Sequence, residues 1–179
     1  MIIMMGGIPT SGKSTIARNI LKELGSGEKM LEPMKLFPCE KRGDVLVIGR
    51  YPDGETFGGT DRISYGAISK FRDFIDQEAP KHKHIFLEGD RFFRSIEIEW
   101  LIENHNAKVY ILTVSPEEEK RRHIERQDTQ TEKWLQGRRS QISNIQTNFM
   151  LMGLLKVYSN DTMEASENIQ REILKWIKL

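Results

Sequence analysis

Gly7-Ile8-Pro9-Thr10-Ser11-Gly12-Lys13-Ser14-Thr15 matches G-x-x-x-x-G-K-[ST], the pattern of a phosphate-binding loop, or Walker A motif. The apolar residues 2–5 (IIMM) precede it and predict a buried strand, and apolar residues recur at helical spacing from Ile16 to Leu24 after it. A loop of this kind between a strand and a helix predicts a nucleotide-binding α/β protein. The alternative is a glycine-rich turn that binds no nucleotide.

Each residue type in this loop suits a triphosphate. Backbone N–H groups must point inward around the phosphates, and Gly7 and Gly12 allow the dihedral angles and the close approach that this requires. The start of the following helix adds a partial positive charge. We expect Lys13 to reach the β- and γ-phosphates and the Ser14 hydroxyl to ligate Mg²⁺. The residues assigned to ATP in this loop are Gly7, Pro9, Thr10, Ser11, Gly12, Lys13, Ser14 and Thr15.

Length and composition narrow the class of protein. The chain has 179 residues and a formal net charge of +1, which suits one domain over residues 1–179 and argues against a broad nonspecific nucleic-acid surface. Cys39 is the only cysteine, so no disulfide can form within the chain. No apolar run approaches the roughly 20 residues of a membrane span. We therefore expect a cytoplasmic protein with no membrane partner.

Apolar, β-branched runs alternate with helical patterns along the chain. This alternation predicts an α/β fold of the P-loop NTPase kind, with a five-stranded, mainly parallel sheet sandwiched by helices. Leu36 and Phe37 are candidates for an extra strand that pairs with residues 44–51. A closing helix is expected over residues 161–179, with Asp161 or Thr162 as its N-cap. The five strands are expected at residues 2–5, 44–51, 84–90, 108–114 and 154–159.

Two acidic residues, Glu88 and Asp90, follow the apolar run Ile85-Phe86-Leu87. An acidic residue at the end of an apolar strand is the Walker B pattern, in which the carboxylate holds Mg²⁺ or orients the nucleophile. The sequence leaves open which of the two lies nearer the metal. The alternative is a solvated strand end with no ligand.

A glycine-rich loop over residues 54–62 ends in Asp61-Arg62. Its glycines indicate a backbone that approaches something closely. We expect Asp61 to act as the general base that takes a proton from an acceptor hydroxyl, and Arg62 to neutralise phosphate charge. Asp61 could also serve as a helix N-cap. Tyr51 and Phe57 are candidates either for stacking on a planar acceptor or for ordinary packing.

Arginines are concentrated in residues 117–139, which predict two helices joined by a polar break. Arg122 and Arg126 are four residues apart and share a helix face, and Arg138 lies on the second helix. A helical lid with inward arginines would exclude water and neutralise charge on the transferred phosphoryl group. The alternative is a solvated charged face paired with the neighbouring glutamates.

Asn160-Asp161-Thr162 follows the last predicted strand. Asn160 and Thr162 are candidates for the adenine pocket, although a helix cap explains the same residues. The four histidines show no metal-ligand spacing, so no zinc site is expected. Trp134 belongs either to the core or to the acceptor site.

These motifs together resemble small P-loop kinases of the nucleoside and nucleotide kinase type, from residue 2 to about residue 162. Gly49-Arg50-Tyr51 and Thr56-Phe57-Gly58-Gly59-Thr60-Asp61-Arg62 are similar to bacteriophage kinases that phosphorylate 5-hydroxymethyluracil in DNA, a DNA modification that leads to hypermodified thymines. The resemblance implies ATP and Mg²⁺ as cofactors and a hydroxymethyl group on a pyrimidine as acceptor. For a phage-encoded protein it implies the host cytoplasm as the location.

Three functions remain open from the sequence. The first is a kinase whose acceptor is that DNA base, a free nucleoside, a nucleotide or a polynucleotide 5′ end. The second is a P-loop ATPase or GTPase, but Asn104-His105-Asn106-Ala107 is not the Asn-Lys-x-Asp motif that reads guanine. The third is a nucleotide-binding module without catalysis, which would not need Lys13, Ser14 and the strand-end acids together.

Overall fold

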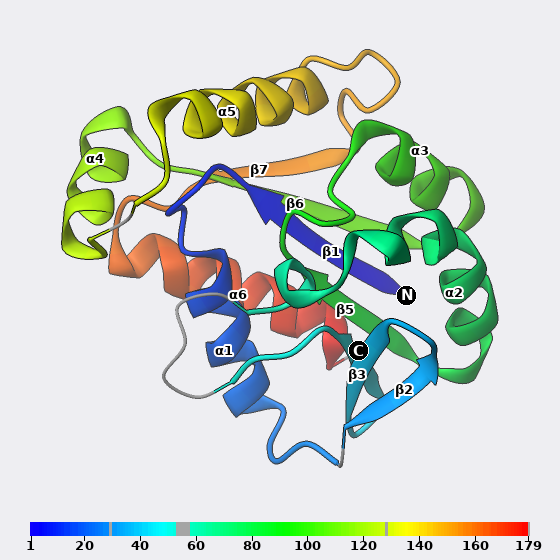
Figure 1. Cartoon of the computed structure of the whole chain (residues 1–179). Coiled ribbons are helices and arrows are strands. Elements are labelled where there is room, and N and C mark those ends of the chain that lie inside the picture. The colour runs from blue at the N-terminus through cyan, green and yellow to red at the C-terminus, as the bar shows by residue number, and fades with distance from the viewer. Residues whose placement is uncertain (29, 53–57, 128, 179) are drawn as a thin grey trace.

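The computed structural model describes residues 1–28, 30–52, 58–127 and 129–178. A single sheet forms its centre, and the strands run in the order β2-β3-β4-β5-β1-β6-β7 (Figure 1). β4, β5, β1, β6 and β7 run parallel to one another, whereas β3 is antiparallel to β4 and β2 is antiparallel to β3. The strands are β1 (Ile2–Gly7), β2 (Leu31–Met34), β3 (Phe37–Arg42), β4 (Val45–Ile48), β5 (His84–Glu88), β6 (Ala107–Thr113) and β7 (Leu155–Ser159).

The mainly parallel α/β fold is confirmed, but the expected number of five strands is wrong, because the sheet has seven. The five parallel strands are those that the apolar runs predicted. Phe37 does begin a strand, β3, which pairs with β4, while Leu36 lies in the β2–β3 turn at a positive φ of 80°. Pro33 lies in the edge strand β2, where fewer N–H groups must pair, and Pro38 lies in β3.

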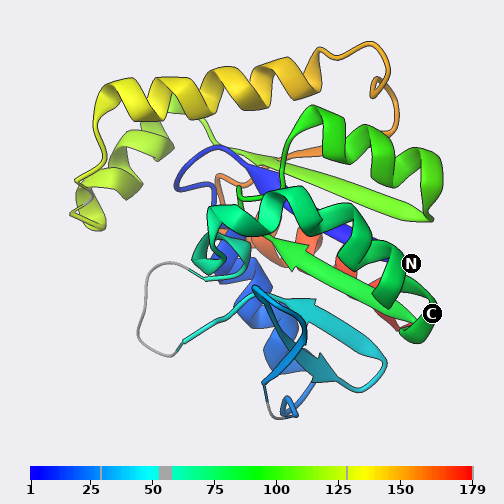
Figure 2. The same ribbon diagram turned by 45° about the vertical axis from the view of Figure 1, so that its right-hand side comes forward.

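Helices cover both faces of the sheet. α1 and α6 pack on one face with Ile3 and Met5 of β1, while α2, α3 and α5 pack on the other face with Ile2 and Met4. This alternation is what a strand buried on both faces requires, since successive side chains point to opposite faces. Figure 2 shows the second group of helices lying across the sheet. The helices are α1 (Lys13–Glu23), α2 (Phe71–Glu78), α3 (Ser95–Asn104), α4 (Pro116–Glu125), α5 (Glu132–Gln146) and α6 (Met163–Ile177).

Local sequence explains the helix boundaries next to the site. Ser115 caps α4 by accepting a hydrogen bond from Glu118 N, and Thr131 caps α5 by accepting one from Trp134 N. Thr162 caps α6 by accepting a hydrogen bond from Ala165 N, so it is the N-cap of the closing helix. No helix in the described ranges is both long and apolar enough to cross a bilayer.

Candidate active site

The Walker A loop joins β1 to α1 at the carboxyl edge of the sheet. Gly12 (φ 85°) and Thr10 (φ 56°) have left-handed backbone conformations. A side chain at Gly7 would place its Cβ 2.1 Å from the carbonyl oxygen of Leu112, so only glycine fits there. The Lys13 ammonium lies inside the loop and donates to the carbonyls of Gly7 (3.1 Å) and Ile8 (2.9 Å). The loop therefore has its folded form, and the Lys13 ammonium lies at its centre.

Two predicted site residues support this loop from outside. Asn160 is buried and its amide donates to the carbonyl of Ser11 at 2.8 Å. The Arg122 guanidinium donates to the carbonyls of Thr10 (3.1 Å) and Asn160 (2.7 Å). Both side chains thus fix the loop backbone. The side-chain hydroxyls of Thr10 and Ser11 are buried and have no hydrogen-bond partner within the described residues.

Glu88 is the carboxylate beside the Walker A serine. Its Oε1 accepts a hydrogen bond from Ser14 Oγ at 3.2 Å, and its Oε2 accepts one from Tyr51 Oη at 3.3 Å. Only 1% of Glu88 is exposed, and burial raises its pKa to about 8; the Lys13 charge opposes this shift and Asp61 adds to it. A buried carboxylate next to a hydroxyl and short of positive charge is a suitable place for a hard cation.

Asp61 and Asp90 form a second acidic pair. Asp61 lies inside the short 3₁₀ helix Thr60–Arg62 and is not its N-cap, which is Gly59. Its Oδ1 accepts a hydrogen bond from Asp90 N at 2.6 Å, and Arg91 donates to its carbonyl oxygen at 3.1 Å. Burial raises the pKa of Asp61, and the charge of Asp90 raises it further. These contacts join the glycine-rich loop to the end of β5.

The glycine-rich loop was predicted to approach another group closely, and in the structure that group is Glu88 of the same chain. Gly59 has a φ of 66°, and a Cβ there would lie 2.3 Å from the carbonyl oxygen and 2.6 Å from Oε2 of Glu88. Tyr51 bonds to Glu88 and packs in the core beside α1, so it does not face a cavity. Phe57 lies outside the described residues.

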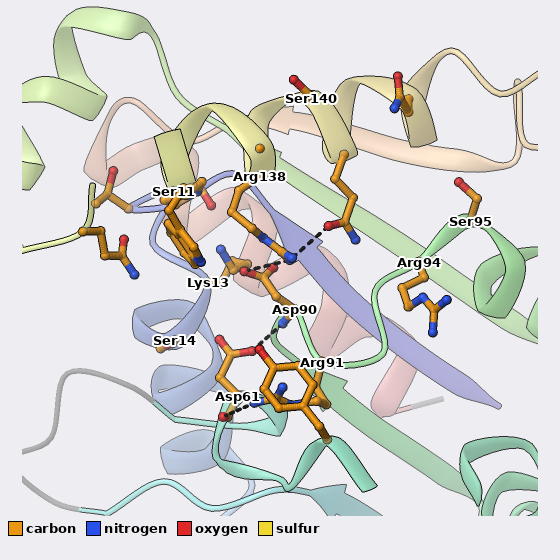
Figure 3. A pocket seen from close by; sticks show the side chains of 18 of the residues that line it. Ser11, Lys13, Ser14, Asp61, Asp90, Arg91, Arg94, Ser95, Arg138 and Ser140 are labelled. Atoms are coloured by element: carbon orange, nitrogen blue, oxygen red, sulfur yellow. Dashed lines mark hydrogen bonds and ion pairs between the residues drawn. The ribbon is translucent and has the colours of Figure 1, made fainter. Parts of the chain in front are cut away.

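One large cavity, of about 1030 Å³, opens between the Walker A loop, the end of β5 and helix α5 (Figure 3). Arg138 reaches from α5 to Asp90, and Lys13 and Asp61 face the same space. Trp134 is 43% exposed and lines this cavity, so it is not a core residue. The lining includes Pro9, Thr10, Ser11, Gly12, Lys13, Ser14, Asp61, Tyr65, Asp90, Arg91, Arg94, Ser95, Arg126, Gln130, Trp134, Arg138, Gln141 and Asn144.

A smaller cavity of about 220 Å³ adjoins the other side of the loop. It is lined by Gly12, Thr15, Arg121, Arg122, Glu125, Arg126, Asn160 and Ser166. Arg126 therefore contributes to both cavities, and Arg122 contributes to the smaller one. Four of the predicted site residues line neither cavity. Arg62 is exposed, Thr162 caps α6, and both Gly7 and Glu88 are buried beneath the loop.

Sequence reasoning assigned no role to Tyr65, Gln141 and Asn144, although all three line the large cavity. Arg91 lies with its guanidinium 3.5 Å from the centre of the Tyr65 ring, and Gln141 donates to the carbonyl of Phe93 at 2.8 Å. Trp134, Gly137, Arg138, Gln141 and Asn144 recur on one face of α5. A helical stripe of polar residues was the available signal, but such a stripe is typical of any solvated helix face.

The residues present fit a nucleotide with Mg²⁺. Mg²⁺ is commonly bound by one or two protein oxygens, with phosphates and water completing the octahedron, and Ser14 and Glu88 supply such a pair. Within the described ranges no group of three or more His, Cys, Asp or Glu residues could hold a metal alone. The metal would therefore depend on the nucleotide for the rest of its ligands.

No protein-family model matches the sequence, and no curated protein matches it either. Among solved structures, the unliganded crystal structure of a sugar kinase from Janibacter sp. HTCC2649 matches with a TM-score of 0.55 at 15% identity, covering 99% of this chain and 94% of that chain. Shikimate kinase from Bacteroides thetaiotaomicron matches with a TM-score of 0.49 at 15% identity, covering 100% and 99% of the two chains. The first match shows a shared fold.

Proposed function

We propose that the protein is an ATP- and Mg²⁺-dependent kinase that transfers the γ-phosphate of ATP to a hydroxyl of a nucleic-acid-type acceptor. The observation that carries this proposal is one shared cavity. It brings the Walker A residues Lys13 and Ser14 together with a carboxylate from a different loop, Asp61. A carboxylate that faces the phosphate site from a separate loop can take the proton of an acceptor hydroxyl. The fold shared with a sugar kinase agrees with this assignment.

In this proposal the Walker A loop binds the triphosphate through its backbone N–H groups. Lys13 leaves the carbonyls of Gly7 and Ile8 to contact the β- and γ-phosphates. Ser14 and Glu88 hold Mg²⁺, with Asp90 as the further acidic residue at the strand end. When bound, Mg²⁺ neutralises charge on the β- and γ-phosphate oxygens. Pro9, Thr10, Ser11, Gly12 and Thr15 belong to the same nucleotide site.

Asp61 takes the proton of the acceptor hydroxyl as that oxygen bonds to the γ-phosphorus, and the bond from this phosphorus to the β–γ bridging oxygen breaks to release ADP. The raised pKa of Asp61 suits a general base, because a more basic carboxylate accepts the proton more readily. Residues 117–139 act as a lid, in which Arg126 and Arg138 neutralise charge on the transferred group. Arg122 and Asn160 keep the loop in place beside the smaller cavity, where we place the adenine.

For the acceptor we propose the 5-hydroxymethyl group of 5-hydroxymethyluracil in DNA, as the resemblance of residues 49–51 and 56–62 implies. The cavity has room for more than a phosphate and offers the exposed ring of Trp134 to a planar base. A free nucleoside, a nucleotide and a polynucleotide 5′ end are the other acceptors to be compared.

The test is transfer of labelled γ-phosphate from ATP to a panel of acceptors. The panel holds free nucleosides, nucleoside monophosphates, DNA with 5′-hydroxyl ends, plain duplex DNA and DNA containing 5-hydroxymethyluracil. Label that appears only on the hydroxymethylated DNA and survives removal of the 5′ ends supports the DNA acceptor. Label on a free nucleoside or nucleotide keeps the kinase and removes the DNA acceptor. Hydrolysis of ATP at an equal rate with and without every acceptor contradicts the kinase.

A further inference from the structure

The two carboxylate oxygens of Glu88 have different neighbours. Oε1 accepts a hydrogen bond from the Walker A residue Ser14 at 3.2 Å, whereas Oε2 accepts one from the phenol of Tyr51 at 3.3 Å. The main-chain carbonyl of Glu88 accepts a third bond, from Thr60 Oγ1 at 3.0 Å. The side chain is 1% exposed, so these contacts with protein groups fix where each oxygen points.

The distance between Ser14 Oγ and Glu88 Oε1 suits two ligands of one Mg²⁺ ion. Ligands at right angles in an octahedron, each 2.0–2.1 Å from Mg²⁺, lie about 3 Å apart. The last torsion of a glutamate side chain has a broad energy minimum, so the carboxylate on its own can turn either oxygen toward the serine. A metal site of this kind therefore needs a group that holds the carboxylate in one orientation.

Tyr51 is placed to hold it. Its ring packs against the buried cluster that includes α1, and main chain closes around it: a Cβ added at Gly58 would lie 2.8 Å from the ring. A Cβ added at Gly59 would lie 2.9 Å from the phenol oxygen and 2.6 Å from Oε2 of Glu88. Gly59 N in turn donates to the carbonyl of Arg50 at 2.8 Å. The phenol and Oε2 are thus enclosed together by backbone that leaves no room for a further side chain.

We propose that Tyr51 is a positioning residue for Mg²⁺: by donating to Oε2 of Glu88, its phenol keeps Oε1 turned toward Ser14 and the metal. This inference rests on the proposed function and adds to it a residue that acts through Glu88. Tyr51 is not among the described residues that line either cavity, so it touches neither the nucleotide nor the acceptor there. Hydrogen-bond partners of a ligating carboxylate are typically worth 10- to 100-fold in metal affinity.

Calorimetric titration with a non-hydrolysable ATP analogue tests this role without turnover. Each variant is titrated once with Mg²⁺ and once with EDTA, and the ratio of the two dissociation constants is the gain in affinity that Mg²⁺ provides. Tyr51→Phe keeps the ring and removes the donor. It should lower this gain by about 10-fold and leave the affinity in EDTA within about twofold of the wild type. Thermal unfolding beside the titrations checks that the variant is folded.

Tyr110→Phe is the matched control, since the Tyr110 phenol also donates to a glutamate, Glu172 Oε1, at 3.4 Å, and lies outside the lining of both cavities. It should leave the gain from Mg²⁺ unchanged. A double-mutant cycle shows whether Tyr51 acts through Glu88. Glu88→Gln should lower the gain by itself, and adding Tyr51→Phe in that background should lower it no further.

Several outcomes would overturn the role of Tyr51. They are an unchanged gain in Tyr51→Phe, an equal loss of affinity with and without Mg²⁺, the same further loss in the Glu88→Gln background, and loss of the folded state in Tyr51→Phe. A wild type whose affinity gains nothing from Mg²⁺ would contradict the metal site of the proposed function, and the role of Tyr51 with it. Absence of phosphoryl transfer would contradict the proposed kinase, while these affinities would still decide the role of Tyr51.

Discussion

Nη2 of Arg138 lies 3.1 Å from Oδ2 of Asp90, so an ion pair joins helix α5 to the end of strand β5 across the candidate active site. Both side chains are more than four-fifths buried, at 19% and 17% exposure. Gln141 makes a second tie through the carbonyl of Phe93. The two contacts hold α5 over the cavity before any nucleotide is bound, and the predictions below begin with this pair.

Breaking the Arg138–Asp90 pair should lower the free energy of unfolding cooperatively. In a double-mutant cycle with Arg138→Gln and Asp90→Asn, we expect a coupling energy of about 1–3 kcal/mol, because removing one partner leaves the other charge largely buried. The exposed pair Arg121–Glu125 is the control and should couple by less than about 1 kcal/mol. Urea unfolding measures both cycles. Equal coupling in the two pairs would show that the Arg138–Asp90 pair does not hold α5.

Lys13→Ala should reduce kcat by orders of magnitude while the fold persists. Among the described residues, the lysine donates only to loop carbonyls, and its proposed task is to stabilise charge on the phosphates. Lys22→Ala, an exposed lysine on the same helix, is the control and should retain normal turnover. Steady-state kinetics and circular dichroism decide the question. Normal turnover by Lys13→Ala would contradict the kinase assignment.

Asp61→Asn should lower kcat far more than it changes the KM for ATP. Asparagine keeps an oxygen that can accept the hydrogen bond from Asp90 N but cannot take the proton of the acceptor. Thermal unfolding run beside the kinetics separates the two roles. Loss of the folded state in Asp61→Asn would assign the residue to holding the end of β5 and not to catalysis.

Gly59→Ala should disturb the site through Glu88. The added Cβ would meet the Glu88 carbonyl oxygen at 2.3 Å, and the φ of 66° adds backbone strain. Gly25→Ala is the control that measures backbone strain without a steric clash, since Gly25 has a φ of 82° and an added Cβ there would have nothing within 4 Å. We expect a loss of about 1 kcal/mol for Gly25→Ala and about 3 kcal/mol or more for Gly59→Ala by urea unfolding. Similar losses in both variants would contradict the close packing of Gly59 on Glu88.

Glu78→Gln should destabilise the protein at neutral pH and much less in acid. Burial by itself would raise the pKa of Glu78, but hydrogen bonds from Lys81, His82 and Gln77 outweigh burial and hold it below its usual value. A lowered folded-state pKa contributes stability above the unfolded-state pKa of about 4.3, and this contribution is lost as the pH falls through the folded-state value.

Urea unfolding at pH 7 should therefore show a loss of about 1–3 kcal/mol for Glu78→Gln, and the loss should shrink steadily below about pH 4. Glu103→Gln, an exposed glutamate on α3, provides the control and should change stability by less than about 0.5 kcal/mol. A loss for Glu78→Gln that is constant from pH 7 to pH 3 would rule out the charge of Glu78 as its source.

The central part of the fold could be predicted because its strands are buried on both faces. The apolar runs of β1, β5 and β6 are nearly continuous, with no alternation of apolar and polar residues, and such runs are typical of a parallel sheet. The edge strands β2 and β3 could not be predicted so well, since they are partly exposed and contain prolines and charged residues. β3 pairs with β4 across the two-residue turn Gly43-Asp44, as predicted, whereas β2 pairs with β3 across a turn in which Leu36, and not a glycine, has the positive φ.

Part of the candidate active site could likewise be predicted from the sequence, and part could not. The Walker A loop is readable because one continuous segment must surround a phosphate, so its glycines and Lys13 have fixed spacing. The sequence also predicts Asp61, Glu88 and Asp90 as site residues, but their arrangement required the structure: Ser14 meets Glu88 across 74 residues of sequence, and Asp61 meets Asp90 across 29. Arg94 and Asn144 gave no signal at all, because a polar residue on an exposed helix start or helix face is the ordinary case.

The central position of β1 in the sheet has a consequence for synthesis on the ribosome. Both of its neighbours follow it in the chain, β5 from His84 and β6 up to Thr113. At about 5–20 residues per second, the roughly 100 residues from β1 to the end of β6 take about 5–20 seconds to make. Until β5 has been made, the apolar IIMM segment has neither of its partner strands, and one edge of β1 stays unpaired until β6 follows.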